Sequence, residues 1–138
     1  MSTLAVGTIK SVSSAAPVFQ NTSGTEKGQL VKAWVNFNGS GTVAIRDSFN
    51  VSSITDHGTG NYTTNFSNAL ANANYAAVGS HGGTSGSTIR MADQGPNLNS
   101  GGFSMTHQTT TSLRFLNGLG NTSVPFNAQY VAIAIFGD

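Results

Sequence analysis

The side chains that could do chemistry in this sequence are few and scattered. Three histidines, His57, His81 and His107, stand in Gly- or Thr-rich surroundings, and only Asp56 lies directly beside one of them. Metal sites in proteins combine several His, Cys, Asp or Glu ligands at recurring spacings, and no such spacing is found here. We therefore predict no metal site and expect these histidines to lie in loops or on the surface.

The sequence lacks the residue patterns that are usual for nucleophilic and acid–base catalysis. The chain has no cysteine and no Gly-x-Ser-x-Gly motif, which excludes a thiolate nucleophile and makes a Ser-His-Asp hydrolase improbable. Paired carboxylates for glycoside hydrolysis would have to come from a pool of five acids, namely Glu26, Asp47, Asp56, Asp93 and Asp138. We predict no catalytic residue, no cofactor and no enzymatic activity.

Asp47 is the one acid whose position calls for an explanation. In strict alternation it shares a strand face with Val43, Ile45 and Phe49, which would direct its carboxylate into the core. A carboxylate in a core needs a partner because desolvating an unpaired charge is costly. Three outcomes remain: a catalytic or ion-binding acid, a salt bridge to an arginine such as Arg90 or Arg114, or a β-bulge that turns Asp47 outward.

Composition limits the classes of partner. Only 8% of the 138 residues are charged and the formal net charge is +1, with the cations scattered singly along the chain. Nucleic-acid binding draws most of its affinity from clustered Lys and Arg, so we predict no nucleic-acid partner. The longest apolar run, residues 130–136, is far shorter than the roughly 20 residues that span a bilayer, so we predict no membrane insertion.

The elements that must position any site are strands. Apolar residues alternate with polar ones over residues 31–37, with Ala33, Val35 and Phe37 on one face and Trp34 on the other. Residues 42–50 repeat the alternation after a Gly-rich link at residues 38–41, which is typical of an antiparallel hairpin. Trp34 could stack on a sugar, but tryptophan in this position more often packs against protein.

Further strands follow at short intervals. Alternation over residues 62–66, the apolar pair Leu113 and Phe115, and turn-forming links rich in Gly and Asn extend the same pattern through the chain. About eight or nine short strands and no long helical period favour an all-β domain, an antiparallel β-sandwich or jelly roll.

The last strand is apolar on both faces. Val131, Ile133 and Ile135 lie on one face, and Tyr130 and Phe136 on the other. A strand of this kind is covered on both sides, so we expect a partner subunit to cover one face of the sheet in a homo-oligomer. Either face could form that contact.

The first residues have a different character. Residues 1–28 carry isolated apolar groups, Leu4, Val6 and Ile9, among Ser, Thr, Ala and Gly. This density of apolar groups is too low for a core of their own, so we predict an N-terminal arm that docks onto another protein, followed by a sandwich domain over residues 29–138.

Two Gly-rich loops in the second half could bind a ligand. His81, Gly82 and Gly83 lie in one, and Asn97 and Asn99 in the other. Glycines let a ligand approach the backbone, and amides supply uncharged hydrogen bonds of the kind that sugars accept, although a plain exposed loop has the same composition.

Residues 31–80 resemble a module of tail-fibre-like and other virion structural proteins of tailed bacteriophages, especially marine ones. The most distinctive strings are KAWVNF at residues 32–37 and NVSSITD at residues 50–56, and the opening MSTLAVGTIK and residues 21–26 resemble the leader of such proteins. The second half of the chain resembles no family.

The resemblance implies a non-enzymatic virion component, on the capsid or tail surface, that forms a homotrimer and contacts other virion proteins. One function is a head decoration or tail appendage held by the N-terminal arm. The alternative is a receptor-binding module that recognises a host cell-surface glycan through the distal loops. A capsule-degrading enzyme ranks third.

Overall fold

The computed structural model describes residues 6–10, 19–82, 104–118 and 125–137, and these fall into two compact units, Met1–Leu30 and Val31–Asp138. In the first unit, β1 (Phe19–Gln20) and β2 (Glu26–Gly28) form an antiparallel hairpin. The Asn21 side chain organises the turn between them, because its Oδ1 accepts hydrogen bonds from the backbone N–H groups of Ser23 (3.2 Å) and Thr25 (2.8 Å).

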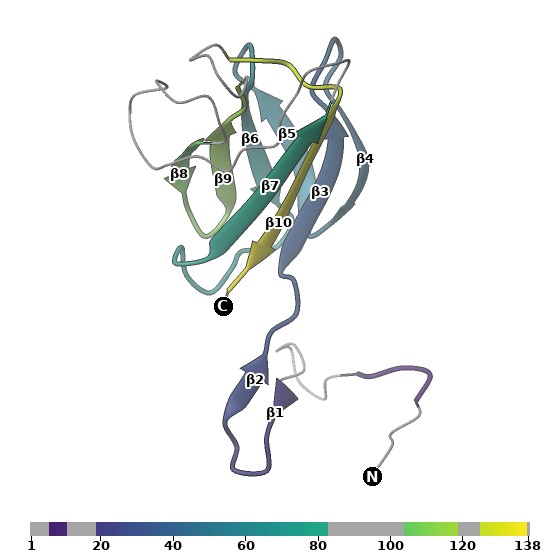
Figure 1. The fold of residues 1–138 in the computed structure, drawn as a ribbon, viewed down its shortest axis with the longest axis vertical. Coiled ribbons are helices and arrows are strands. Elements are labelled where there is room, and N and C mark those ends of the chain that lie inside the picture. The colour runs from purple at the N-terminus through teal and green to yellow at the C-terminus, as the bar shows by residue number, and fades with distance from the viewer. Residues whose placement is uncertain (1–5, 11–18, 83–103, 119–124, 138) are drawn as a thin grey trace. The chain divides into compact units, whose positions relative to one another are not determined.

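The second unit is all-β, as predicted, and its eight described strands form two antiparallel sheets. One sheet has the order β4-β3-β10-β7 and the other the order β5-β6-β9-β8; in Figure 1 the first lies in front of the second. The first comprises β3 (Ala33–Asn38), β4 (Ala44–Phe49), β7 (Ala76–Gly82) and β10 (Tyr130–Phe136). The second comprises β5 (Val51–Asp56), β6 (Asn61–Phe66), β8 (Ser104–Gln108) and β9 (Ser112–Leu116).

The core lies between these two sheets, an arrangement consistent with a β-sandwich. Phe37 of β3 contacts rings of the opposite sheet edge to face, with its centroid 5.2 Å from that of Tyr62 and 6.2 Å from that of Phe115. Period-two alternation places these side chains inward, since Ala33, Val35 and Phe37 are buried while their neighbours in the strand are half-buried. The predicted alternation of β3, β6 and β9 is therefore confirmed.

Asn50 turns the chain from the first sheet into the second. It has a left-handed φ of 55°, which Asn tolerates better than most residues. Its Nδ2 donates to the Lys32 carbonyl (3.1 Å) and the Asn68 carbonyl (3.2 Å), and its Oδ1 accepts from the Asn68 backbone N–H (2.8 Å). One side chain therefore joins three segments where β4 ends and β5 begins.

Two buried tyrosines make the stability of the fold sensitive to alkaline pH. Burial is the main cause that raises the pKa of Tyr62, with the Asp56 carboxylate adding to it, and burial likewise raises the pKa of Tyr75; each goes from 10.0 to about 12. The native state therefore holds its phenol protons at a pH where the unfolded chain releases them. This contribution is fully present below pH 10 and is lost as pH rises through 12.

We expect the free energy of unfolding to fall by on the order of 2–4 kcal/mol across this range, because both phenols resist ionisation in the native state. Denaturant titrations at a series of alkaline pH values, with tyrosinate absorbance as a second signal, measure the fall. The variant Tyr75→Phe should lose about half of the pH dependence. A free energy of unfolding that stays constant up to pH 12 would contradict the burial of both phenols.

Candidate functional site

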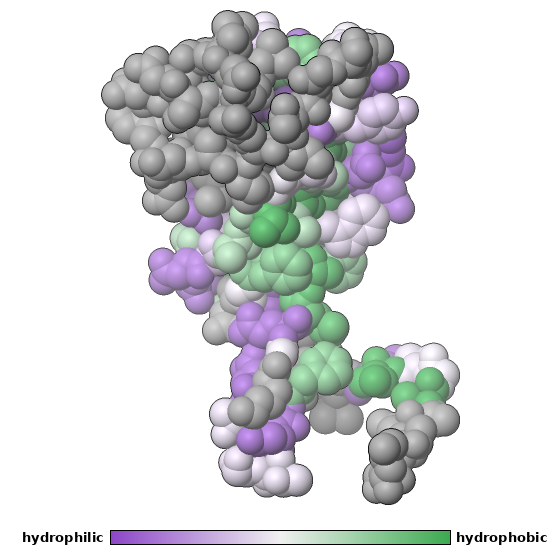
Figure 2. Space-filling view, viewed as in Figure 1, coloured by the Kyte–Doolittle hydropathy of each residue, from purple (hydrophilic) through white to green (hydrophobic). Residues whose placement is uncertain are grey.

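The outward face of the sheet β4-β3-β10-β7 presents two rows of side chains that cross all four strands. The strand register defines their order: Phe49, Trp34, Ala134 and Val78 in one row, and Asp47, Asn36, Ala132 and Ser80 in the other. Hydrophobic residues gather on this face over β3, β10 and β7, as Figure 2 shows. Tyr130 and Phe136, at the two ends of β10, are 51% and 40% exposed.

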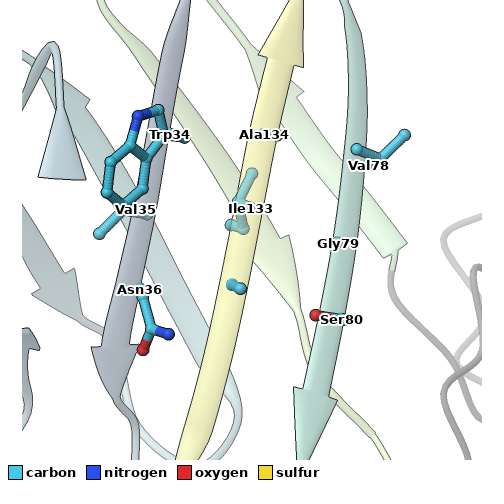
Figure 3. A pocket seen from close by; sticks show the side chains of 9 residues that line it. Trp34, Val35, Asn36, Val78, Gly79, Ser80, Ile133 and Ala134 are labelled. Carbon is cyan, nitrogen blue, oxygen red and sulfur yellow. The ribbon is translucent and has the colours of Figure 1, made fainter. Parts of the chain in front are cut away.

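A groove of about 380 Å³ runs along the middle of this face. Its floor is β10, whose outward residues Ala132 and Ala134 are small, and its sides are formed by β3 and β7. Figure 3 shows the Trp34 ring on the β3 side, with Asn36 below it and Ser80 on the β7 side. None of the nine residues that line the groove is charged: Trp34, Val35, Asn36, Val78, Gly79, Ser80, Ala132, Ile133 and Ala134.

A β-bulge in β4 overturns the prediction that Val43, Ile45, Asp47 and Phe49 share one core-facing side. Asn36 pairs with Asp47 but the next residue, Phe37, pairs with Ile45, so Arg46 is the extra residue. The bulge directs Asp47 outward, the third of the alternatives, where it is exposed and accepts a hydrogen bond from the Ser48 N–H (2.8 Å). Phe49 is likewise outward and 53% exposed.

The bulged Arg46 orients the Asn36 amide. The guanidinium lies over the Tyr130 ring, 4.4 Å from its centroid, and Nη2 donates to the Gln129 carbonyl (2.6 Å). Its Nη1 donates to Asn36 Oδ1 (3.2 Å). Because this bond holds the amide oxygen toward β4, the amide NH₂ is directed to the opposite side, toward β10, as Figure 3 shows.

Two polar groups therefore converge over Ala132 in the groove. The Ser80 hydroxyl points toward β10 from the β7 side, and the Asn36 NH₂ points toward it from β3 (Figure 3). Among the residues that the structure describes, neither Asn36 Nδ2 nor Ser80 Oγ has a hydrogen-bond partner. Both can donate to a bound molecule.

The predicted oligomer-contact residues separate into two groups. Val131, Ile133 and Ile135 are buried in the chain's own core, at 0%, 3% and 1% exposure, and are not available to a second subunit. Tyr130 and Phe136 remain exposed on the groove face. β10 is a central strand of its sheet, between β3 and β7, and this position accounts in part for its apolar residues on both faces.

The predicted ligand loop begins later than expected. His81 and Gly82 belong to strand β7, and His81 is buried at 7% exposure on the core side, paired with Val131, so it is not a loop ligand. Gly83, Asn97 and Asn99 lie outside the described residues, as does Leu4 of the predicted docking set. The other two docking residues, Val6 and Ile9, are 53% and 60% exposed.

His57 and Arg114 make hydrogen bonds within the second sheet. His57 forms a hydrogen bond through Nε2 to the Thr63 hydroxyl (2.9 Å) beside the β5–β6 turn, and Arg114 donates to Asn61 Oδ1 (3.0 Å). Within the described ranges, no three His, Cys, Asp or Glu residues lie close enough to hold a metal ion. The same ranges contain no helix long and apolar enough to cross a membrane.

Sequence reasoning assigned Trp34 to packing and missed the groove beside it. The sequence feature that could have indicated the groove is the pair of small outward residues in the last strand, Ala132 and Ala134, with large residues next to them in the chain. That signal becomes a groove only when Trp34 and Val78 are known to flank the alanines in neighbouring strands.

Comparison of the chain with protein-family models, with curated proteins and with solved structures found no match.

Proposed function

We propose that the chain is a non-enzymatic virion structural protein, a surface subunit that attaches to the particle through its N-terminal arm. The observation that carries this proposal is the exposure of the arm's apolar residues. Val6, Ile9 and Phe19 are 45–60% exposed. Apolar side chains that find no core in their own unit gain free energy by burial against a partner.

The small size of the arm hairpin supports the same role. A two-stranded hairpin is marginally stable in water, and β1 and β2 have only two and three residues. Docking onto a neighbouring protein would supply the burial that the hairpin lacks. The resemblance of residues 31–80 and of the leader to virion proteins implies that this neighbour is another virion protein.

Removing the apolar groups of the arm should abolish attachment without unfolding the second unit. We expect the full-length triple variant Val6→Ser, Ile9→Ser, Phe19→Ser to lose at least tenfold in affinity for particles assembled without this subunit, since each buried apolar side chain contributes about 1.5–3 kcal/mol. Co-sedimentation with such particles measures the loss, and circular dichroism checks the fold.

The control is Ile45→Ser, which removes an apolar group that is 36% exposed on β4 and belongs to the second unit. It should attach like the wild type. Attachment of the triple variant at wild-type affinity would refute docking through the arm.

A homotrimer is the assembly state that the resemblance implies. Because Val131, Ile133 and Ile135 are internal, the contacts would come from the arm or from Tyr130 and Phe136, the predicted contact residues that stay exposed. The alternative function is recognition of a host glycan, and the groove of the β4-β3-β10-β7 face is a candidate site for it.

A further inference from the structure

The groove on the β4-β3-β10-β7 face has two hydrogen-bond donors on its sides, Asn36 Nδ2 and Ser80 Oγ, and the first of them is held in place. Asn36 Nδ2 cannot rotate away without breaking the bond from Arg46 Nη1 to Asn36 Oδ1, and Arg46 is itself held by the Gln129 carbonyl and the Tyr130 ring. A donor oriented before the ligand arrives loses less conformational entropy on binding. The bulge in β4 thus orients a hydrogen-bond donor of the groove, because the bulged residue Arg46 holds the Asn36 amide.

The two donors lie on opposite sides of β10. They project from β3 and β7, which flank β10, and neighbouring strands lie about 4.8 Å apart, so the two backbones are roughly 10 Å apart. Each side chain points toward β10 (Figure 3), where the strand register places Ala132 between Asn36 and Ser80. A sugar ring carries several hydroxyl groups at its edge and can present acceptors to both donors.

Trp34 supplies an apolar wall in the adjacent row. Trp34 is half-buried beside Ala134 and is one of the residues that line the groove. Aromatic rings pack against the C–H face of a sugar while hydroxyls at the sugar edge take hydrogen bonds. With all nine lining residues uncharged, the groove matches an uncharged ligand.

A protein partner fits these features less well. A second copy packed flat on this face would leave Asn36 Nδ2 and Ser80 Oγ desolvated over the alanine floor unless it brought two matched acceptors, and each unmatched donor would cost free energy. A saccharide carries hydroxyl acceptors around its ring and satisfies both donors from one residue.

We propose that this groove binds a neutral saccharide. One hexopyranose ring lies over Ala132 and Ala134, with its C–H face toward Trp34, and its hydroxyl oxygens accept hydrogen bonds from Asn36 Nδ2 and Ser80 Oγ. This site lies on a sheet face, away from the loops to which sequence reasoning assigned sugar binding. It rests on the groove alone and not on attachment of the arm to a virion.

The test is an array of neutral glucose-, mannose-, galactose- and N-acetylglucosamine-based oligosaccharides, probed with the full chain at low and high salt. We expect binding that changes little with salt because none of the described residues that line the groove is charged. Asn36→Ala and Ser80→Ala should each weaken binding about tenfold, the effect of one lost hydrogen bond in a groove. Ile45→Ser, on β4 and outside the groove, is the matched control and should bind like the wild type.

Arg46 is a positioning residue, and a double-mutant cycle tests that role. Arg46→Ala should weaken binding severalfold in the wild-type background and have no further effect in Asn36→Ala, because it acts only through the amide. Equal effects of Arg46→Ala in both backgrounds would refute the orientation of Asn36 by Arg46.

Two outcomes would overturn the proposal. One is the absence of binding to every neutral oligosaccharide. The other is an oligomer that dissociates in light scattering when Ala132→Gln fills the groove, which would identify this face as a contact between copies. The arm triple variant separates the two proposals, because it should bind saccharides normally even though it fails to attach to particles.

Discussion

Replacing Gly60 with alanine is expected to lower the free energy of unfolding by more than about 3 kcal/mol. Gly60 has a left-handed φ of 67°, and a Cβ at this position would clash with the Asn117 carbonyl oxygen and lie 2.7 Å from the Phe126 nitrogen. Both are backbone atoms, which cannot move aside as a side chain could.

The same glycine joins three segments through hydrogen bonds. Its N–H donates to Asn127 Oδ1 (2.6 Å) and its carbonyl accepts from the Asn117 N–H (2.7 Å). Asn127 Oδ1 also accepts from the Tyr62 hydroxyl (2.8 Å), which reaches the core. Displacing Gly60 would therefore disturb the β5–β6 turn, the end of β9 and the approach to β10 together.

Gly41→Ala is the matched control for this prediction. Gly41 has the same φ of 67°, but a Cβ there would meet nothing within 4 Å. The Gly41→Ala variant should lose about 1–2 kcal/mol of the free energy of unfolding, the cost of the left-handed backbone alone. Urea denaturation of both variants isolates the steric part of the cost, and equal losses for the two would show that the close packing around Gly60 is not as described.

Ile133→Asp should prevent stable folding, whereas Ala134→Asp should not. The two residues are neighbours in β10 on opposite faces: Ile133 is 3% exposed in the core, and Ala134 is half-buried on the groove floor. The substitution at position 133 removes the packing of the isoleucine and buries an unpaired carboxylate. Together these changes lower the free energy of unfolding by about 4 kcal/mol or more. At position 134 the carboxylate keeps contact with water.

Far-ultraviolet circular dichroism and thermal melting compare the two variants, and light scattering records their mass. A folded, monomeric Ile133→Asp would contradict the core position of Ile133 and would restore it as a contact between subunits. A misfolded Ala134→Asp would contradict the outward position of the groove floor.

The strands with strict alternation could be predicted from the sequence because a period of two is a local property. Ala33, Val35 and Phe37 in β3, and Leu113 and Phe115 in β9, are buried as the pattern indicated. The turn at residues 38–41 could also be predicted. There Asn38 Nδ2 donates to the carbonyls of Ser40 (2.6 Å) and Thr42 (3.0 Å) within the same short segment.

The face of β4 could not be predicted, because a bulge is decided by the partner strand. Strict alternation would put Ile45, Asp47 and Phe49 on one face, yet one extra residue at Arg46 moves Asp47 and Phe49 to the outside of the sheet. The contacts of Arg46 with the Tyr130 ring and the Gln129 carbonyl, more than eighty positions away, lie at this bulge. No pattern within β4 contains that information.

What the sequence by itself determined is the all-β class, the hairpin links and the core faces of the regularly alternating strands, since these depend on side-chain period and turn chemistry within a few residues. Only the tertiary structure decided which apolar face of β10 is internal and that Trp34, Asn36 and Ser80 surround a row of alanines. Those facts depend on which strands become neighbours and in what register, and strand pairing joins residues such as Trp34, Ala134 and Val78 that are far apart in the chain.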